Sequence, residues 1–172
     1  MKTKFFIFTL LLMGALLTAC EKSDIEYDND FGNSHKAWLS FKQSSNNSYR
    51  YMVAQGSVFG SSTETVITIK NGKITQRHFK YTSLEGTVNL PAEMREWTEN
   101  ENEINTHNVP EALTLDQVYE KAKTDWLLKR KDADTYFEAK NNGIISSCGY
   151  VEKGCMDDCF IGIHVAYVEA LQ

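Results

Sequence analysis

The sequence contains few of the features by which enzymes and membrane-spanning proteins are usually recognised. It has no Gly-x-Ser-x-Gly, His-Glu-x-x-His, phosphate-loop or dinucleotide-binding motif, and nothing in it requires a cofactor. After the first twenty residues, no stretch is apolar enough to cross a bilayer. Basic residues are also in the minority, with 18 lysines and arginines against 23 acidic residues, which argues against binding to nucleic acid or to acidic lipid headgroups.

The first twenty residues have the pattern of a bacterial lipoprotein signal peptide. Lys2 and Lys4 precede an apolar segment over residues 5–17, and Ala19 precedes Cys20. At about 1.5 Å per residue, the apolar segment reaches roughly 20 Å, short of the roughly 30 Å hydrocarbon core of a bilayer. We therefore predict that a signal peptide over residues 1–19 is removed and that acylated Cys20 anchors the protein in the outer membrane of the bacterial cell envelope.

The segment after Cys20 is polar and acidic. Residues 21–32 carry five acidic residues and one lysine, so they bury too little apolar surface to offset their chain entropy. We predict a lipidated acidic tether over residues 20–32 and a single α+β domain over residues 33–172. Acidic residues directly after a lipidated cysteine resemble a signal for export to the cell surface, and the sequence is equally compatible with an orientation toward the periplasm.

Hydrophobic periodicity predicts a helix and then a strand at the start of the domain. Asn33 or Ser34 can cap a short helix that ends near residues 44–47. Side chains over residues 48–53 then alternate with a period of two, as in a strand. One face of the predicted helix holds three apolar residues: Ala37, Trp38 and Phe41.

A β-hairpin is predicted over residues 65–76. Asn71-Gly72 separates two β-rich runs and suits a type I′ turn, because both central residues of that turn need a positive φ. Arg77 then faces water together with Lys70 and Lys73. The predicted register places two pairs opposite one another: Ile69 with Ile74, and Ile67 with Gln76.

Residues 84–112 show no clear periodicity. They are polar and acidic, contain Pro91 and Pro110, and suggest only one helical turn near residues 91–97. A stretch of this length inside a small domain is either a functional loop or a mobile insert, and the sequence favours neither.

A second helix and three strands complete the predicted domain. Thr114 and Gln117 match a capping box at the start of this helix. Strands follow over residues 135–140, 144–152 and 160–170, the last of them central in its sheet. The fold class is therefore α+β, an antiparallel β-sheet with helices packed on one face in helix-strands-helix-strands order. The apolar stripe of the second helix consists of Leu115, Val118, Tyr119, Ala122, Trp126 and Leu127.

Several short motifs occur in a recognisable order over residues 33–170. They are a helix containing Trp38, the pair Tyr49-x-Tyr51, the Asn71-Gly72 hairpin, the Thr-Leu-Asp-Gln-Val-Tyr helix opening at Thr114, the run Gly143-x-x-x-Ser147, and Asp157-Asp158. In this order they resemble a family of uncharacterised secreted bacterial lipoproteins, defined only as a domain of unknown function. The resemblance implies an exported domain with no assigned reaction. This chain has Ile145 where members often have proline, and Cys155 and Cys159 are particular to it.

Three cysteines remain for the folded domain once Cys20 is acylated. In an oxidising compartment we expect one disulfide and one free thiol, and we favour Cys155–Cys159 over a bridge from Cys148 to either of them. The alternative is a metal site built from these two thiolates with Asp157 and Asp158. Zinc sites prefer two separated ligand pairs, and calcium loops need several oxygens at fixed offsets, so a solvated turn and no metal is the simpler interpretation.

A thiol enzyme would use Cys148 with a histidine as its base. No nucleophile motif surrounds Cys148, and the four histidines are scattered along the chain. His164, on the last predicted strand, is more simply a packing residue. We therefore predict no catalytic residue.

Three functions are compatible with the sequence. The first is a non-catalytic binding or interaction module on a lipid anchor, which recognises a protein partner through the sheet face and residues 84–112. The second is an inhibitor that inserts that segment into the cleft of an extracytoplasmic enzyme. The third is a thiol-dependent hydrolase. An exposed cluster around Tyr81 and Trp97 over a concave sheet would favour binding, and a pocket joining Cys148 to a histidine would favour catalysis.

Overall fold

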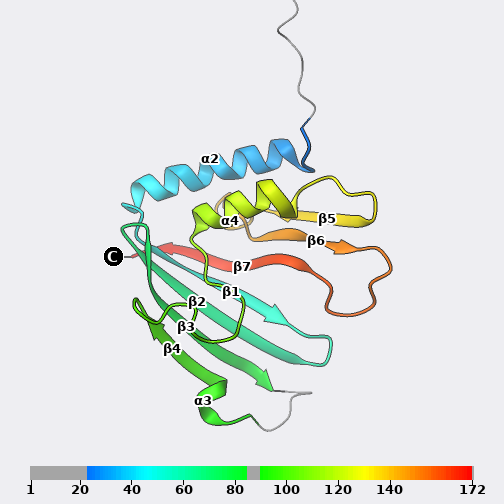
Figure 1. Ribbon diagram of the computed structural model, residues 1–172. Coiled ribbons are helices and arrows are strands. Elements are labelled where there is room, and N and C mark those ends of the chain that lie inside the picture. The colour runs from blue at the N-terminus through cyan, green and yellow to red at the C-terminus, as the bar shows by residue number, and fades with distance from the viewer. Residues whose placement is uncertain (1–22, 85–89, 172) are drawn as a thin grey trace, which may run out of the picture.

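The computed structural model describes residues 23–84 and 90–171, so the predicted signal peptide and Cys20 lie outside the described residues (Figure 1). The helices and strands are, in chain order, α2 (Asp28–Ser44), β1 (Tyr49–Gly56), β2 (Ser61–Lys70), β3 (Lys73–Leu84), α3 (Ala92–Arg95), β4 (Glu96–Asn100), α4 (Leu115–Lys121), the π-helix η2 (Ala122–Trp126), β5 (Ala133–Glu138), β6 (Ser147–Glu152) and β7 (Ile161–Ala170).

The strands form one seven-stranded sheet in the order β4-β3-β2-β1-β7-β6-β5. Every strand pairing in the described residues is antiparallel. Two meanders, β1 to β4 and β5 to β7, are joined where β1 pairs with β7 (Figure 1). The predicted α+β class with an antiparallel sheet is confirmed, but α3 and β4 occupy part of residues 84–112, so the element order is more complex than predicted.

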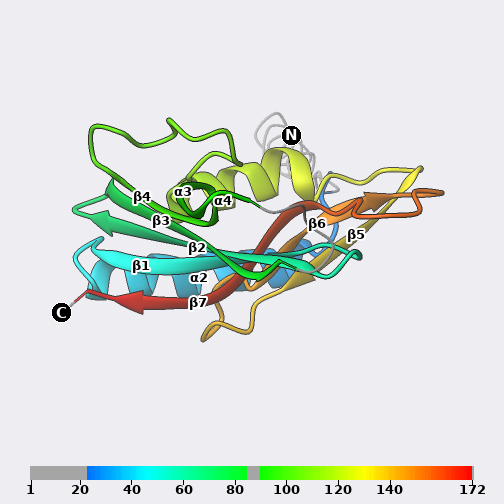
Figure 2. The same ribbon diagram turned by 90° about the horizontal axis from the view of Figure 1, so that it is seen from below.

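Helices α2 and α4 share one hydrophobic core with the sheet. Trp38 of α2 is fully buried, and its ring lies 5.1 Å from that of Tyr49 in β1 and 6.3 Å from that of Tyr119 in α4. Seen from below, α2 lies behind β1 and β7 (Figure 2). Burial of a large apolar side chain contributes about 1.5–3 kcal/mol, so this aromatic cluster is a principal link between helices and sheet.

The N-terminal part of the chain belongs to the folded body, contrary to prediction. Helix α2 begins at Asp28 rather than near residue 33, and Ile25 and Phe31 are each only 7% exposed. Ile25 forms a bridge with Leu128. Acidic residues in the first turn of α2 stabilise its positive end, which explains the acidic composition without a tether. The predicted solvated tether is therefore wrong for residues 25–32.

The β2–β3 hairpin has the predicted turn but not the whole predicted register. Asn71 and Gly72 have φ values of 49° and 80°, and Ile69 lies opposite Ile74 as expected. A register shift between Thr68 and Ile69 then places Ile67 opposite Arg77 instead of Gln76. Because a one-residue shift exchanges the two faces of a strand, Arg77 points into the core and is fully buried. The prediction that Arg77 faces water was wrong.

Helix α4 begins at the predicted capping box. The Thr114 hydroxyl accepts a hydrogen bond from the Gln117 backbone N–H, and the Gln117 side chain accepts one from the Thr114 N–H. All six residues of the predicted apolar stripe are buried. The helix widens into the π-helix η2 before it ends at Trp126, which lies near the sheet.

The last strand, β7, lies between β1 and β6, so its predicted central position is confirmed. A register shift beside Met52 and Val53 places Val53 opposite Val165 and Met52 opposite Tyr167. Tyr167 consequently lies on the face away from the core, whereas regular alternation along β7 would place it on the same face as Val165.

Candidate binding groove

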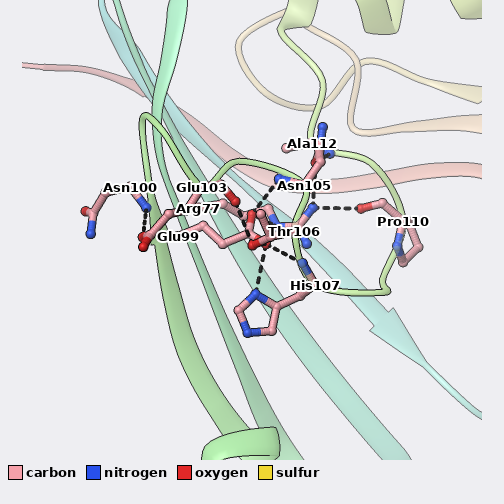
Figure 3. Close-up of polar contacts among 9 residues, drawn as sticks. All are labelled: Arg77, Glu99, Asn100, Glu103, Asn105, Thr106, His107, Pro110 and Ala112. Carbon is pink, nitrogen blue, oxygen red and sulfur yellow. Dashed lines mark hydrogen bonds and ion pairs between the residues drawn. The ribbon is translucent and has the colours of Figure 1, made fainter.

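A buried ion pair joins β3 to β4 beneath the loop that follows β4 (Figure 3). The Nε atom of Arg77 lies 3.2 Å from an Oε atom of Glu99, and both side chains are almost fully buried. Arg77 Nη1 donates hydrogen bonds to the side-chain oxygen of Asn105 at 2.8 Å and to the carbonyl of Pro110 at 3.2 Å. The guanidinium also lies 4.9 Å from the centre of the Trp97 ring, a cation–π distance.

Glu99 fixes the same loop from the other side of the ion pair. Its carboxylate accepts hydrogen bonds from the backbone N–H of Asn105 at 2.8 Å, the backbone N–H of His107 at 2.7 Å and the Thr106 hydroxyl at 3.2 Å. The His107 ring nitrogen Nδ1 lies 2.9 Å from the same carboxylate. One buried side chain thus holds residues 105–107 in place. These residues belong to the segment 84–112, which was predicted to be a functional loop or a mobile insert, and they form a fixed wall.

The surroundings of Glu99 favour its charged form. Burial by itself raises the pKa of this carboxyl, but hydrogen bonds from His107 and Asn105 and the charge of Arg77 together lower it to about 2. Burial lowers the pKa of Arg77, and the charge of Glu99 opposes that shift. Each ion compensates the desolvation of the other, so neither is replaceable alone.

Aromatic rings continue the fixed structure. The Trp97 ring stacks with two neighbours. Its centre lies 3.9 Å from that of the His107 ring and 5.0 Å from that of the Phe79 ring. Tyr81 follows at 5.3 Å from Phe79 with its ring edge-on. Tyr81 and Trp97 therefore lie in one row of rings along β3 and β4. Both are half-buried and Phe79 between them is buried, so this row is not the exposed cluster that would favour binding.

A groove of about 390 Å³ lies between this loop and the core face of the sheet. Its floor comes from β1, β2 and β3, and its walls come from the loop after β4, the α4–η2 helix and the start of β7. Most lining side chains are aromatic or aliphatic, among them Phe79, Tyr81 and Trp126. Glu111 and Lys121 supply charges at the wall, and neither side chain has an ion-pair or hydrogen-bond partner among residues 23–84 and 90–171.

Two tyrosines of β1 connect the groove to the start of α4. The Tyr51 hydroxyl donates a hydrogen bond to the carbonyl of Leu113, and the Tyr49 hydroxyl accepts one from the backbone N–H of Leu115. Trp38 Nε1 donates to a carboxylate oxygen of Asp116 at 2.9 Å. The loop is thus tied at both ends, by the ion pair and by these hydroxyls.

Cys148 does not form a catalytic pair with His164. Cys148 is fully buried on the core face of β6, and burial raises the pKa of its thiol to about 12. His164 lies opposite Ser147, the neighbour of Cys148, so the two side chains point to opposite faces of the sheet. The His164 ring nitrogen Nδ1 is 3.0 Å from the Ser147 hydroxyl, and burial lowers the pKa of His164.

Cys155 and Cys159 lie at disulfide distance in the β6–β7 loop, with Cα atoms 6.1 Å apart, and Cys148 is free. Asp158, between them in sequence, accepts hydrogen bonds from the Ser57 hydroxyl and the Val58 backbone N–H. No group of three or more potential metal ligands occurs within the described part of the chain.

Sequence reasoning missed Arg77, Glu99 and His107 as determinants of the groove. The only available signal was the alternation of Trp97 and Glu99 over residues 96–100, which a polar composition obscured. No helix in residues 23–84 or 90–171 is both long and apolar enough to span a bilayer. Comparison of the chain with protein-family models, curated proteins and solved structures finds no match.

Proposed function

We propose that the protein is a non-catalytic binding module of the bacterial cell envelope, anchored in the outer membrane through acylated Cys20, and that its groove takes a small, mainly apolar ligand. One observation carries this proposal: an apolar pocket of about 390 Å³ whose far wall is held by a buried ion pair. Ligand pockets are commonly about 300–1,000 Å³, largely apolar and formed in advance, with a few polar groups that orient the ligand.

The arrangement of the groove suits binding better than chemistry. The Arg77–Glu99 pair is buried beneath the loop, where it fixes the wall. The one free thiol among the described residues is buried with a raised pKa, so it is a poor nucleophile. Glu111 and Lys121, which have no ion-pair or hydrogen-bond partner within the described part of the chain, can orient a ligand that carries a polar group at one end.

The groove is tested by filling it. Thr65 lines the floor, so Thr65→Phe places a ring in the groove, whereas Thr98→Phe makes the same change at an exposed position of β4. The unmodified chain and Thr98→Phe should enhance the fluorescence of anilinonaphthalene sulfonate at a saturable site, and Thr65→Phe should lose the enhancement. Native mass spectrometry of protein purified from its own envelope should show a bound small molecule in the same two proteins. Equal binding by all three proteins would exclude the groove as the site.

The anchor is tested separately. Metabolic labelling with a palmitate analogue should tag the protein, and Cys20→Ala should abolish the label and release the protein from the membrane fraction. Cys148→Ser serves as the control, because that buried thiol is not expected to carry lipid. Unlabelled protein with an intact N-terminus would contradict the proposed anchor.

A further inference from the structure

β1 and β7 run side by side over only part of their lengths (Figure 1). They pair up to Val53 of β1, which lies opposite Val165 of β7. Beyond that point, and among the residues that the structure describes, residues 54–56 of β1 pair only with β2, and residues 161–164 of β7 pair only with β6. Each of these two stretches therefore has one unpaired edge, and the two edges face the same space.

A pocket of about 560 Å³ occupies the place where the two strands diverge. We call this pocket the wedge. Gln55 and Gly56 line it from β1, and Gly162 and His164 line it from β7. Gln55 and Gly162 line both the groove and the wedge, so the two pockets adjoin.

Two loops that touch close the outer end of the wedge, so an extended chain that enters must displace their contact. Asp158 of the β6–β7 loop accepts hydrogen bonds from the Ser57 hydroxyl at 2.7 Å and from the Val58 backbone N–H at 3.0 Å in the β1–β2 turn. The two linked loops carry exposed apolar side chains, with Val58 65%, Phe59 70% and Met156 91% exposed. These side chains are available to contact a molecule bound at this end of the wedge.

The backbone of both strands defines the chemistry of that molecule. In an antiparallel strand, successive residues direct their N–H and C=O groups to alternate neighbours, so residues 54–56 and 161–164 each point such groups into the wedge. Backbone polar groups require partners, and an extended chain supplies donors and acceptors along both of its edges. At the outer edge of β4 or β5, such a chain would form main-chain hydrogen bonds along only one of its own edges.

We propose that the wedge binds an extended peptide segment of another protein, which adds a strand between β1 and β7. Main-chain hydrogen bonds to both edges supply the affinity, as in other cases of strand addition. The apolar side chains at the outer end of the wedge contact the partner beyond the paired segment. This proposal stands independently of the ligand proposed for the groove.

A synthetic peptide tests the proposal. The probe is the acetylated and amidated hexapeptide Thr-Val-Thr-Val-Thr-Lys, with two isomers N-methylated either at both valines or at the first two threonines. The unmodified peptide should shift the amide resonances of residues 54–56 and 161–164 and slow their hydrogen exchange. Because the wedge pairs with both edges of the peptide, either set of N-methyl groups should abolish binding. At an outer edge of the sheet only one set would do so.

Two glycine variants provide the matched protein control. A Cβ added at Gly56 or at Gly32 meets no atom within 4 Å, so both positions accept a larger residue. Gly56→Phe places a ring in the wedge and should abolish peptide binding. Gly32→Phe, on α2, should bind the peptide like the unmodified chain.

The outcomes separate this proposal from that of the groove. Lack of any shift at millimolar peptide, shifts confined to β4 or β5, or equal binding by Gly56→Phe would each overturn the wedge. Because Gly56 does not line the groove, dye binding by Gly56→Phe should persist in every case. Loss of dye binding in Thr65→Phe with no peptide binding by any protein would leave the groove standing and remove the wedge.

Discussion

Arg77 is the residue on which the candidate site depends most. Its guanidinium reaches Glu99, Asn105 and the carbonyl of Pro110, so one side chain of β3 holds β4 and two separate points of the loop. A buried ion pair contributes little net stability, because desolvation offsets the attraction between the charges. Its value here is geometric, since it determines where the wall of the groove lies.

Glu99→Gln should strongly destabilise the protein. The change leaves the Arg77 charge buried without its counter-ion, which typically costs about 3–5 kcal/mol of unfolding free energy. Urea unfolding measures the loss. Glu96→Gln is the control on the same strand, because Glu96 is exposed and pairs with exposed His78, so its effect should be within about 0.5 kcal/mol. Similar losses of unfolding free energy in both variants would show that buried Arg77 does not require a charged partner.

Glu99 also predicts an acid-induced loss of stability. Its pKa is about 2 in the folded protein against an ordinary value of 4.5, so between these pH values the unfolded chain binds more protons. The stabilisation is complete above pH 4.5 and disappears as the pH falls toward 2, with a total on the order of 3 kcal/mol. Unfolding free energies measured along this range should decline less steeply in Glu99→Gln. Parallel curves for the two proteins would rule out Glu99 as the titrating group.

The Cys148 thiol should resist alkylation in the folded protein. Burial raises its pKa to about 12 and removes it from solvent, so iodoacetamide at pH 8 should label it only as fast as the protein unfolds. Mass spectrometry follows the label, and addition of urea should accelerate it. Immediate labelling without urea would mean that Cys148 is accessible, and would revive the thiol-enzyme hypothesis.

At the scale of single elements, a glycine in the β2–β3 turn and a glycine within α2 should respond in opposite ways to replacement by alanine. Gly72 has a φ of +80°, and a Cβ there would lie 2.6 Å from the Asn47 side-chain nitrogen. Gly72→Ala should therefore destabilise the protein by about 1–3 kcal/mol. Gly32 lies within α2 with open space around it, so Gly32→Ala should stabilise it by about 0.5–1 kcal/mol. Opposite signs of the two changes in urea unfolding are the decisive result.

The contrast between that turn and its flanking strands shows what the sequence can reveal. Asn71-Gly72 is a local signal, because positive φ at two successive residues is a property of those residues alone. The register shift beyond it has no such signal, so the pattern assigned Ile67 and Arg77 to opposite faces when they lie on the same one. The error concerned Arg77, which holds the wall of the groove. It followed from one extra residue in the pairing of β2 with β3.

Strand β4 was missed for a related reason. Its inward positions are occupied by Trp97 and Glu99, and a charged residue at an inward position makes a five-residue strand look like a polar loop. Only the burial of Arg77 makes an inward glutamate favourable, and that burial depends on the distant register shift. The helix start at Thr114 and the apolar stripe of α4 were predictable, because caps and periodicity are local.

For the molecule as a whole, the joining of β1 to β7 creates both candidate sites. The β1–β4 meander and the β5–β7 meander meet along only part of these two strands. The groove lies on the core face of that junction, and the wedge lies at its open end. A fully paired β1 and β7 would leave no unpaired edges between the meanders.

The boundary of the folded body supplies the last prediction. Ile25 and Phe31 are buried against Leu128 and the Tyr119 ring, and each contributes about 1.5–3 kcal/mol. A chain that begins at residue 33 also lacks the first residues of α2, so it should unfold at markedly lower urea than one that begins at residue 23. Phe31→Ala in the longer chain should fall between them. Equal urea midpoints for the two chain lengths would support the predicted tether over residues 20–32. The expected order of midpoints would mean that the folded body starts at Ile25, five residues after the proposed lipid attachment site, Cys20.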